Sequence, residues 1–499
     1  MTRFLFRLLL LSMVIFQSCK VSHHFVPQHK FDRQQLENDY QLFRNTIEKN
    51  HPSLYWYTSS DSMKYYFGKY ESLIEDSMTE NDFQWKVLSP LLNKIHCGHT
   101  SVVMSKASSD WYKNRKLVTF PFHLKVWNDT MAVMESLLKN DSLFKRGVII
   151  KSINGISSRE LISDMLGRLS EDGYSHNVNY IRISANFPML HRYIYGVSPH
   201  YNVSYIDSNG QSRDTIVPAY KPEKDSSIKK DTISIRKAKI KTPGKLEKYR
   251  SLTIDSSGIF AVMHLNSFSK GKLHTFYRKS FRTLRQKNIK HLVVDVRLNG
   301  GGLVTRSTLF TKYLIDTSFK VADSVYSITR NLGSNRKYFK GKIWNEIGLK
   351  LMTKKYKDGK YHIRRYEKHF YHPKKKNNYN GKAYILISGP TFSASCMAVN
   401  ALKDQDNITV IGEEAGGGWY GNSGILIPSF TLPHTRLRVR LPLFRVLQYH
   451  HQPENKGKGI QPDILVPTSY EALLKGYDKK WQVVKDMILS QQKVSAINH

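Results

Sequence analysis

The stretch His291–Gly302 reads HLVVDVRLNGGG. Its first half is mostly apolar, which is typical of a strand buried on both faces of a sheet. The three glycines that follow can turn the backbone sharply and expose amide groups without interference from a Cβ atom. A second apolar stretch, Phe260–Leu265, precedes it, and Leu273–Leu284 between them carries one helical stripe of apolar side chains. Strand, helix and strand with short links predict a parallel pair with a right-handed crossover.

The same pattern returns further along the chain. Ala383–Ser388 and Ile408–Ile411 are apolar strand candidates, and Ser393–Leu402 between them has helical character. The repeat predicts an α/β domain in which helices pack on a mostly parallel sheet. Ligands of such sheets bind beyond the carboxyl ends of the strands. The two turns that matter are therefore Asp295–Gly302 and Thr391–Cys396.

Each of these turns has a chemical and a plainer interpretation. Consecutive glycine amides can hold an anion. The turn lacks the Gly-Lys-Ser/Thr ending and the spacing of nucleotide-binding loops, so an oxyanion hole fits better than a phosphate site. Ser393 stands at a helix N-terminus, where unpaired amides stabilise negative charge. A serine there can equally be a simple N-cap.

Taken together, the motifs resemble those of the tail-specific, C-terminal processing and tricorn proteases. The matching pattern is Asp-x-Arg-x-Asn-Gly-Gly-Gly at 295–302, followed by Ser-Ala-Ser at 393–395. Further matching pieces lie in the family's order at 95–100, 401–404, 410–413 and 459–463. The resemblance implies a multidomain α/β protein with a crotonase-like catalytic core, a helical N-terminal domain and a PDZ-like module.

The resemblance also implies roles for single residues. The first serine of Ser-Ala-Ser would be the nucleophile, which is Ser393, with Ser395 as the fallback. The oxyanion would be held by the amides of Ala394 and Gly301. Many relatives use a lysine about 25 residues beyond the serine as base, but the sequence around Gly418 contains none.

The base is therefore expected from the tricorn branch, which pairs a histidine with a glutamate. His99 in the motif IHCGHT matches that histidine, although Gly98 stands where tricorn-type proteases carry a serine. The orienting acid is predicted to be Glu454. An imidazole of ordinary pKa, about 6.5, would make activity decline on the acid side of neutrality.

Three other carboxylates are weighed beside Glu454. Glu413 and Glu414 are further candidates for the orienting acid, whereas Asp463 has the position of a structural carboxylate at a strand start.

Cys97 and Cys396 flank the expected site, and they are either a disulfide of an exported protein or two buried free thiols. No metal or organic cofactor is implied.

The N-terminus predicts export. Arg3 and Arg7 accompany an apolar run, Phe4–Phe16, that is too short to span a bilayer and is typical of a signal peptide. The run ends in Phe-Gln-Ser-Cys, which resembles a bacterial lipobox and makes Cys19 the expected lipid-modified residue. We therefore expect a lipoprotein of the periplasm or cell envelope, anchored in the outer membrane. Simple secretion is the alternative.

Composition shifts divide the rest of the chain. Residues 147–166 contain a strand, an Asn-Gly turn and a short helix, the order found in part of a PDZ domain. A plain hairpin-and-helix insert is the alternative. The predicted divisions are a signal peptide at 1–19, a tether at 20–30, a helical N-terminal domain at 31–117, a PDZ-like domain and connector at 118–240, a crotonase-like protease core at 241–470 and a helical tail at 471–499.

The charge is strongly basic: 77 Lys and Arg stand against 40 Asp and Glu, a net charge of +37. Nucleic acid is not expected as a partner, because the sequence has no helix-turn-helix, zinc-finger or RNP pattern. A solvated basic surface near anionic lipid headgroups is the simpler interpretation.

The sequence therefore predicts a serine-type endopeptidase that hydrolyses peptide bonds in exported or unfolded proteins. The main alternative is an inactive family member that binds peptides or apolar ligands as a lipoprotein. A binder of anionic polymers is a third hypothesis, which rests on the charge alone.

Overall fold

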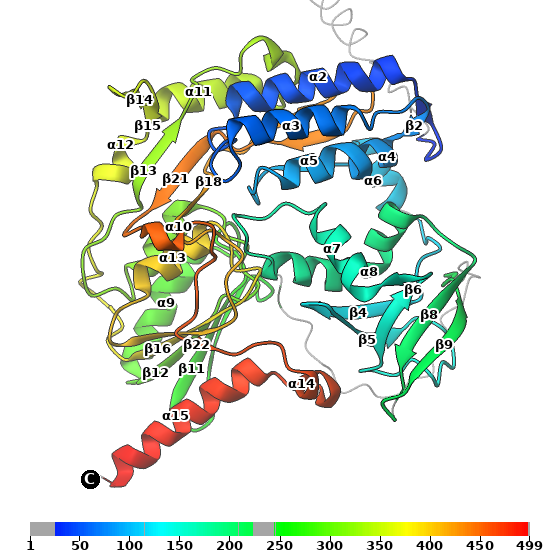
Figure 1. Ribbon diagram of the computed structural model, residues 1–499. Coiled ribbons are helices and arrows are strands. Elements are labelled where there is room, and N and C mark those ends of the chain that lie inside the picture. The colour runs from blue at the N-terminus through cyan, green and yellow to red at the C-terminus, as the bar shows by residue number, and fades with distance from the viewer. Residues whose placement is uncertain (1–24, 114, 208, 223–243, 245, 498–499) are drawn as a thin grey trace, which may run out of the picture.

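The computed structural model describes residues 25–113, 115–207, 209–222, 244 and 246–497 (Figure 1). The predicted signal peptide, with Cys19, lies outside the described residues, as does most of the connector before the catalytic core.

A six-stranded sheet lies at the centre of the region predicted as the crotonase-like core. The strand order is β10-β11-β12-β16-β17-β22, and every neighbouring pair is parallel except β10 with β11. The predicted strands and helices are present within one or two residues. The bounds are Arg250–Ile254, Phe260–Leu265, His291–Asp295, Lys382–Ile387, Ile408–Gly412 and Ile464–Leu465 for the strands, and Leu273–Gln286 (α9), Val304–Thr311 (α10) and Ala394–Leu402 (α13) for the helices.

Alternating side chains divide between the two faces of this sheet. On β12, Leu292 and Val294 join the core formed with α9, α10 and α13, whereas Val293 points to the opposite face. There it packs with Val484 and Ile488 of α15 (Lys479–Ile497), which runs beneath the sheet (Figure 1). The strands are therefore apolar on both sides, as the sequence pattern predicted.

A second, antiparallel sheet follows the order β4-β5-β6-β8-β9, with β7 paired to β6. The Asn154-Gly155 turn between β6 and β7 places both residues at positive φ. Helices α7 (Ser158–Leu166) and α8 (Asn177–Tyr195) cover one side. The strands are Phe122–Trp127, Thr130–Ser136, Ile149–Ile153, His200–Ile206 and Ser212–Pro218, with β7 at Ile156–Ser157.

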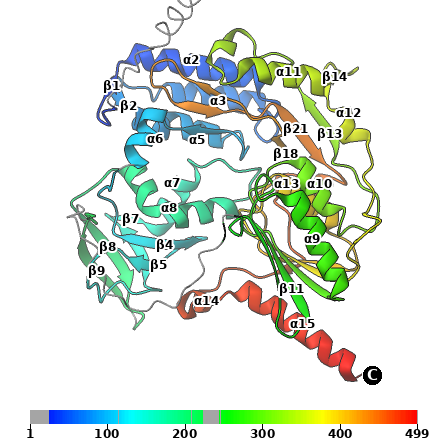
Figure 2. The same cartoon turned by 180° about the vertical axis from the view of Figure 1, so that it is seen from behind.

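The helical N-terminal region shares its hydrophobic core with distant parts of the chain. One cluster joins Phe43, Phe67 and Leu91 to Val325 and Phe444. Figures 1 and 2 show α7 and α8 lying between these helices and the antiparallel sheet. The N-terminal elements are β1 (Lys30–Phe31), α2 (Arg33–Asn50), α3 (Ser60–Glu71), β2 (Met78–Thr79), α4 (Glu80–Asp82), a π-helix at Phe83–Leu88, α5 (Ser89–Asn93), β3 (Ser101–Val103) and α6 (Lys106–Lys113).

Two further sheets complete this shared core. One has the order β14-β15-β13-β21-β18, and the other, β19-β20-β3, pairs the N-terminal β3 with β20. No helix within the described ranges is long and apolar enough to cross a membrane. The remaining elements are β13 (Ala322–Ser327), α11 (Lys342–Met352), β14 (Lys354–Lys355), β15 (Tyr361–His362), α12 (Arg364–Lys368), β18 (Gly421–Gly424), β19 (Ser429–Thr431), β20 (Arg438–Arg440), β21 (Phe444–Gln448) and α14 (Tyr470–Lys475), with short 3₁₀ turns at Ser334–Tyr338 and Pro453–Asn455.

Candidate active site

Ser393 occupies a strained turn between β16 and α13. Its backbone has φ 56° and ψ −125°, a conformation that a residue with a side chain adopts only when its surroundings impose it. Such a strand-to-helix turn is the geometry that presents a nucleophilic hydroxyl at the end of a sheet. Ser393 is half-buried, whereas Ser395 is fully buried and its Oγ has no hydrogen-bond partner. Of the two serines, the structure leaves Ser393 accessible.

The glycine turn packs directly on Ser393. A Cβ atom on Gly301, whose φ is +92°, would lie 2.8 Å from Ser393 Cβ and 2.9 Å from Ala394 N. Phe392 N donates to Asn299 O at 3.1 Å, which ties the two turns together. The predicted juxtaposition of the glycine turn with Ser393 and Ala394 is therefore present.

The amide of Gly301 is already engaged inside its own turn. It donates to Asn299 Oδ1 at 2.9 Å, so it would have to leave that oxygen before it could hold an oxyanion. Ala394 is the first residue of α13, where helical amides lack intrahelical acceptors. Of the two predicted donors, Ala394 is the better placed.

A second glycine loop, residues 416–418, lies under the same turn. A Cβ atom on Gly417 would stand 2.6 Å from Cys396 Sγ and 3.0 Å from Ser393 N. This is the region where the sequence lacks the lysine of other relatives. The backbone is so close to Ser393 that a side chain has no room at Gly417.

His99 lies beside Phe392, the residue that precedes Ser393. Its ring packs on the Phe392 ring with centroids 4.7 Å apart, and only 7% of the residue is exposed. Nδ1 has no hydrogen-bond partner, and no hydrogen bond joins His99 to Ser393 in the part of the chain that the structure describes. Burial, together with the charges of Arg440 and Arg182, lowers the pKa of His99 to about 3. The imidazole is therefore neutral over the physiological range.

The structure does not bring Glu454 to His99. Glu454 lies exposed in the 3₁₀ turn Pro453–Asn455, and no hydrogen bond or ion pair joins it to His99 in the described part of the chain. The other weighed carboxylates have different partners: Glu413 pairs with Lys480, Glu414 accepts from the Gly459 amide at 2.8 Å, and Asp463 pairs with Lys403. The expected glutamate partner of the histidine is thus not supplied by these positions.

Asp172, which the sequence did not single out, is the carboxylate that contacts the histidine loop. Its Oδ1 accepts from the amide of Gly98 at 2.7 Å, and its Oδ2 accepts from the amide of Gly418 at 3.4 Å. It therefore joins the loop that carries His99 to the loop beneath Ser393. Asp172 follows α7 in a connecting loop, and no motif marks it.

The neighbours of Asp172 extend this junction. Gly173 N donates to His96 O at 3.0 Å, and Ser175 Oγ donates to Ala415 O at 2.8 Å. Asp172 is 2% exposed, and burial raises its pKa to about 7, opposed by the two amides. Residues 171–175 therefore contact both the loop that carries His99 and the loop beneath Ser393.

Cys97 and Cys396 are both free and buried. The structure therefore shows the free thiols rather than the disulfide. Burial raises the pKa of the Cys97 thiol to about 12, and Cys396 donates to Thr391 O at 3.2 Å. Neither thiol has the character of a reactive thiolate.

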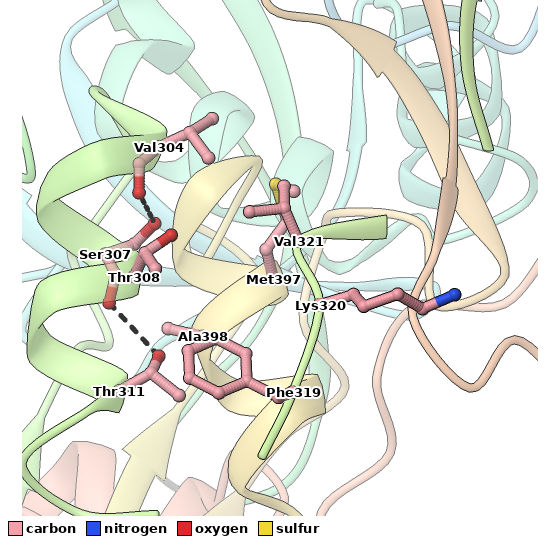
Figure 3. Close-up of a pocket in the computed structure, with 9 residues that line it drawn as sticks. All are labelled: Val304, Ser307, Thr308, Thr311, Phe319, Lys320, Val321, Met397 and Ala398. Carbon is pink, nitrogen blue, oxygen red and sulfur yellow. Dashed lines mark hydrogen bonds between the residues drawn. The ribbon is translucent and has the colours of Figure 1, made fainter. Parts of the chain in front are cut away.

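A small cavity lies between α10 and α13 (Figure 3). Its volume is about 10 Å³, enough for a single water. The side chain of Lys320 points away from the cavity in Figure 3. The cavity is a packing defect of the core. Its lining residues are Val304, Ser307, Thr308, Thr311, Phe319, Lys320, Val321, Met397 and Ala398.

Among the described residues, no group of three His, Cys, Asp or Glu side chains is arranged to hold a metal ion.

Comparison with known proteins shows what the chain is similar to. Residues 259–466 match the model of peptidase family S41. No curated protein matches the sequence.

Solved structures resemble the whole chain. Mature CPAF complexed with lactacystin aligns with a TM-score of 0.62 at 12% identity, over 93% of this chain and 98% of that one. Mature CPAF alone gives a TM-score of 0.59 at 12% identity, over 88% and 94%. The tricorn protease aligns at 0.41 and 14% identity, over 92% of this chain and 37% of its own. The likeness to CPAF shows that the fold extends over nearly the whole length.

Proposed function

Since the chain belongs to peptidase family S41 through residues 259–466, we propose that it is a serine endopeptidase in which Ser393 is the nucleophile and His99 the general base. The observation that carries the proposal is the strained backbone of Ser393 at the start of α13, wedged against Gly301. No ordinary N-cap serine needs that conformation, because N-cap residues have extended backbones.

The proposed reaction is acyl transfer. Ser393 Oγ attacks the peptide carbonyl carbon and passes its proton to His99, while the Ala394 amide donates to the developing oxyanion. His99 then protonates the leaving amine, and water, activated by the same imidazole, releases the acyl group. The neutral imidazole is the form that this step requires. The hydrogen bond between Ser393 and His99 would form on substrate binding, as catalytic hydrogen bonds often tighten then.

We propose that Asp172 takes the positioning role that was expected of Glu454. It holds the Gly98 amide rather than the imidazole itself, so it would act through the loop that carries His99. Substrates would be exported or unfolded proteins, in keeping with the export signal that the sequence predicts.

Covalent labelling tests the nucleophile. A fluorophosphonate probe should label the protein, and Ser393→Ala should abolish both the labelling and the hydrolysis of unfolded casein. Ser395→Ala removes a buried hydroxyl two residues away and is the matched control, which should retain the label. Labelling that persists in Ser393→Ala would show that another residue is the nucleophile.

The location is proposed separately. A lipid anchor on Cys19 should incorporate radiolabelled palmitate in cells, and Cys19→Ala should remove the label and release the protein from the membrane fraction. A chain that stays acylated in Cys19→Ala would refute the lipobox interpretation.

A binding function without catalysis is the second candidate. Among the described residues, His99 has no hydrogen bond to Ser393 or to Glu454, and this favours a binding function. Such a protein would bind peptides from unfolded substrates without turnover, and Ser393→Ala would leave that binding unchanged.

A further inference from the structure

Helix α11 presents its apolar side chains to solvent. Leu351 and Trp344 are 82% and 77% exposed, the two highest values among the large hydrophobic residues described. Ile343 and Ile347 are 57% and 39% exposed. These four residues, the α11 ridge, fall on one side of the helix because they are spaced three, four and eight apart.

The orientation of α11 is fixed by its opposite side. Leu349 is its one fully buried apolar residue, and Glu346 accepts from the Leu332 amide at 3.2 Å while it pairs with Arg336 at 2.9 Å. A surface helix normally turns its apolar stripe to the core and its polar residues to water. In α11 the arrangement is the reverse, and no described part of the chain covers the ridge.

The surroundings of the ridge are strongly basic. Residues 337–368 contain eleven Lys or Arg and three Asp or Glu. Of the three acids, Glu367 is buried against His362 and Glu346 pairs with Arg336. Exposed lysines lie at both ends of the helix, among them Lys340, Lys350 and Lys354.

We propose that the α11 ridge inserts into the headgroup region of an anionic lipid bilayer, with the surrounding lysines on the phosphates. Exposed Trp, Leu and Ile beside Lys and Arg is the composition of interfacial helices, in which the apolar face enters the acyl boundary. Lysine stems extend along apolar surface and keep their ammonium groups at the headgroups. A protein partner of ordinary composition would not require this excess of positive charge.

The position of α11 suits this contact. It lies alongside α2 on the outer side of the molecule, away from α15, as Figures 1 and 2 both show. Asn335 Nδ2 just before α11 donates to Thr46 Oγ1 of α2 at 2.9 Å. The helix that follows the N-terminal segment and the α11 ridge therefore share one side, so a lipid anchor and the ridge could reach the same membrane.

Trp344 makes the proposal testable in the full-length chain. It is the single exposed tryptophan of seven, and residues 1–24 contain no tryptophan, so the anchor contributes no signal. The purified chain should be reconstituted in vesicles of phosphatidylglycerol with brominated acyl chains, which quench nearby indoles. We expect a loss of emission equal to the share of one tryptophan, absent in Trp344→Phe and retained in the control Trp481→Phe on α15.

Further measurements decide whether anionic lipid or a second copy of the chain covers the α11 ridge. Brominated phosphatidylcholine, or added salt with phosphatidylglycerol, should reduce the quenching several-fold because the lysines contribute electrostatically. Equal quenching in wild type and Trp344→Phe would overturn the proposal, and equal quenching in both lipids would overturn its anionic part. Absent quenching, together with a dimer in sedimentation that Trp344→Ser dissociates, would identify a second copy of the chain as the occupant instead.

Discussion

Ser393 and Ser395 are two residues apart, and their surroundings give them different chemistry. Ser393 projects from a strained turn at the mouth of the sheet, while Ser395 is enclosed in α13 with an unpaired hydroxyl. The strain at Ser393 is maintained by backbone contacts from Gly301 and Gly417. The backbone conformation therefore decides which of the two serine hydroxyls is accessible to a substrate.

The buried imidazole of His99 sets the expected pH dependence. Because burial lowers its pKa to about 3, His99 stays unprotonated from pH 8 down to about pH 4. The acid limb expected from an ordinary imidazole near pH 6.5 should therefore be missing, and loss of kcat/KM through His99 should begin only below about pH 4. The measurement is kcat/KM between pH 3.5 and 8 on a peptide without titratable groups. A midpoint near 6.5 would mean that His99 is solvated in the working enzyme.

Asp172→Asn and Glu454→Gln separate the two carboxylates. Asparagine can accept from only one of the amides of Gly98 and Gly418, so we expect Asp172→Asn to lower kcat about tenfold, the equivalent of one lost hydrogen bond. Glu454→Gln, at an exposed position, should leave kcat within about twofold. The opposite result would restore Glu454 as the acid and leave Asp172 as a packing residue.

The two turns around Ser393 act as one element. Gly301→Ala would place a methyl group 2.8 Å from Ser393 Cβ at a φ of +92°, so the serine turn must shift. A shift of about 1 Å costs on the order of 100-fold in rate, which kcat measurements would detect. Gly300→Ala is the matched control, because a Cβ there meets nothing within 4 Å and its φ is not positive. It should retain activity, and a similar loss in both variants would indicate general disruption of the turn.

Whether an element could be predicted depended on how it is buried. The core strands are apolar on both faces and bounded by turns, so their ends could be placed from sequence to within one or two residues. Helix α8 was missed, because it contains Pro188 and a non-helical residue at Asn186, and these break its apolar stripe. Ser393 and His99 could be proposed by resemblance because both lie in recognisable motifs, and their roles stay predictions. Asp172 could not, because its amide partners are 74 and 246 residues away in the chain.

At the scale of the molecule, buried neutral histidines make stability depend on pH. His51, His99 and His191 have pKa values lowered by burial to about 3, 3 and 4. The unfolded chain binds their protons more readily, so each contributes stability that is present above about pH 6.5 and is lost as the pH falls toward the folded pKa. Asp172 has the opposite effect, because burial raises its pKa in the folded protein. It contributes stability at low pH, and this stability is lost as the pH rises from about 4 to 7.

His191→Phe isolates one of these groups far from the active site. His191 packs among Phe120, Phe187 and Tyr201, and its Nδ1 has no partner. Phenylalanine fits such an environment and cannot be protonated. Relative to wild type, the variant should gain up to about 3 kcal/mol of unfolding free energy between pH 6.5 and 4. Urea unfolding at both pH values measures this, and an unchanged difference would show that His191 is protonated in the folded state.

The pairing of β3 with β20 has a consequence for the order of events in the cell. The loop that carries His99 leads into β3, and the partner strand Arg438–Arg440 is made more than three hundred residues later. A chain that is still emerging from the ribosome therefore cannot pair β3 with β20, and the loop that carries His99 lacks this support until then. If His99 is the base, as proposed, we expect no hydrolysis by the chain before Arg438–Arg440 has been synthesised.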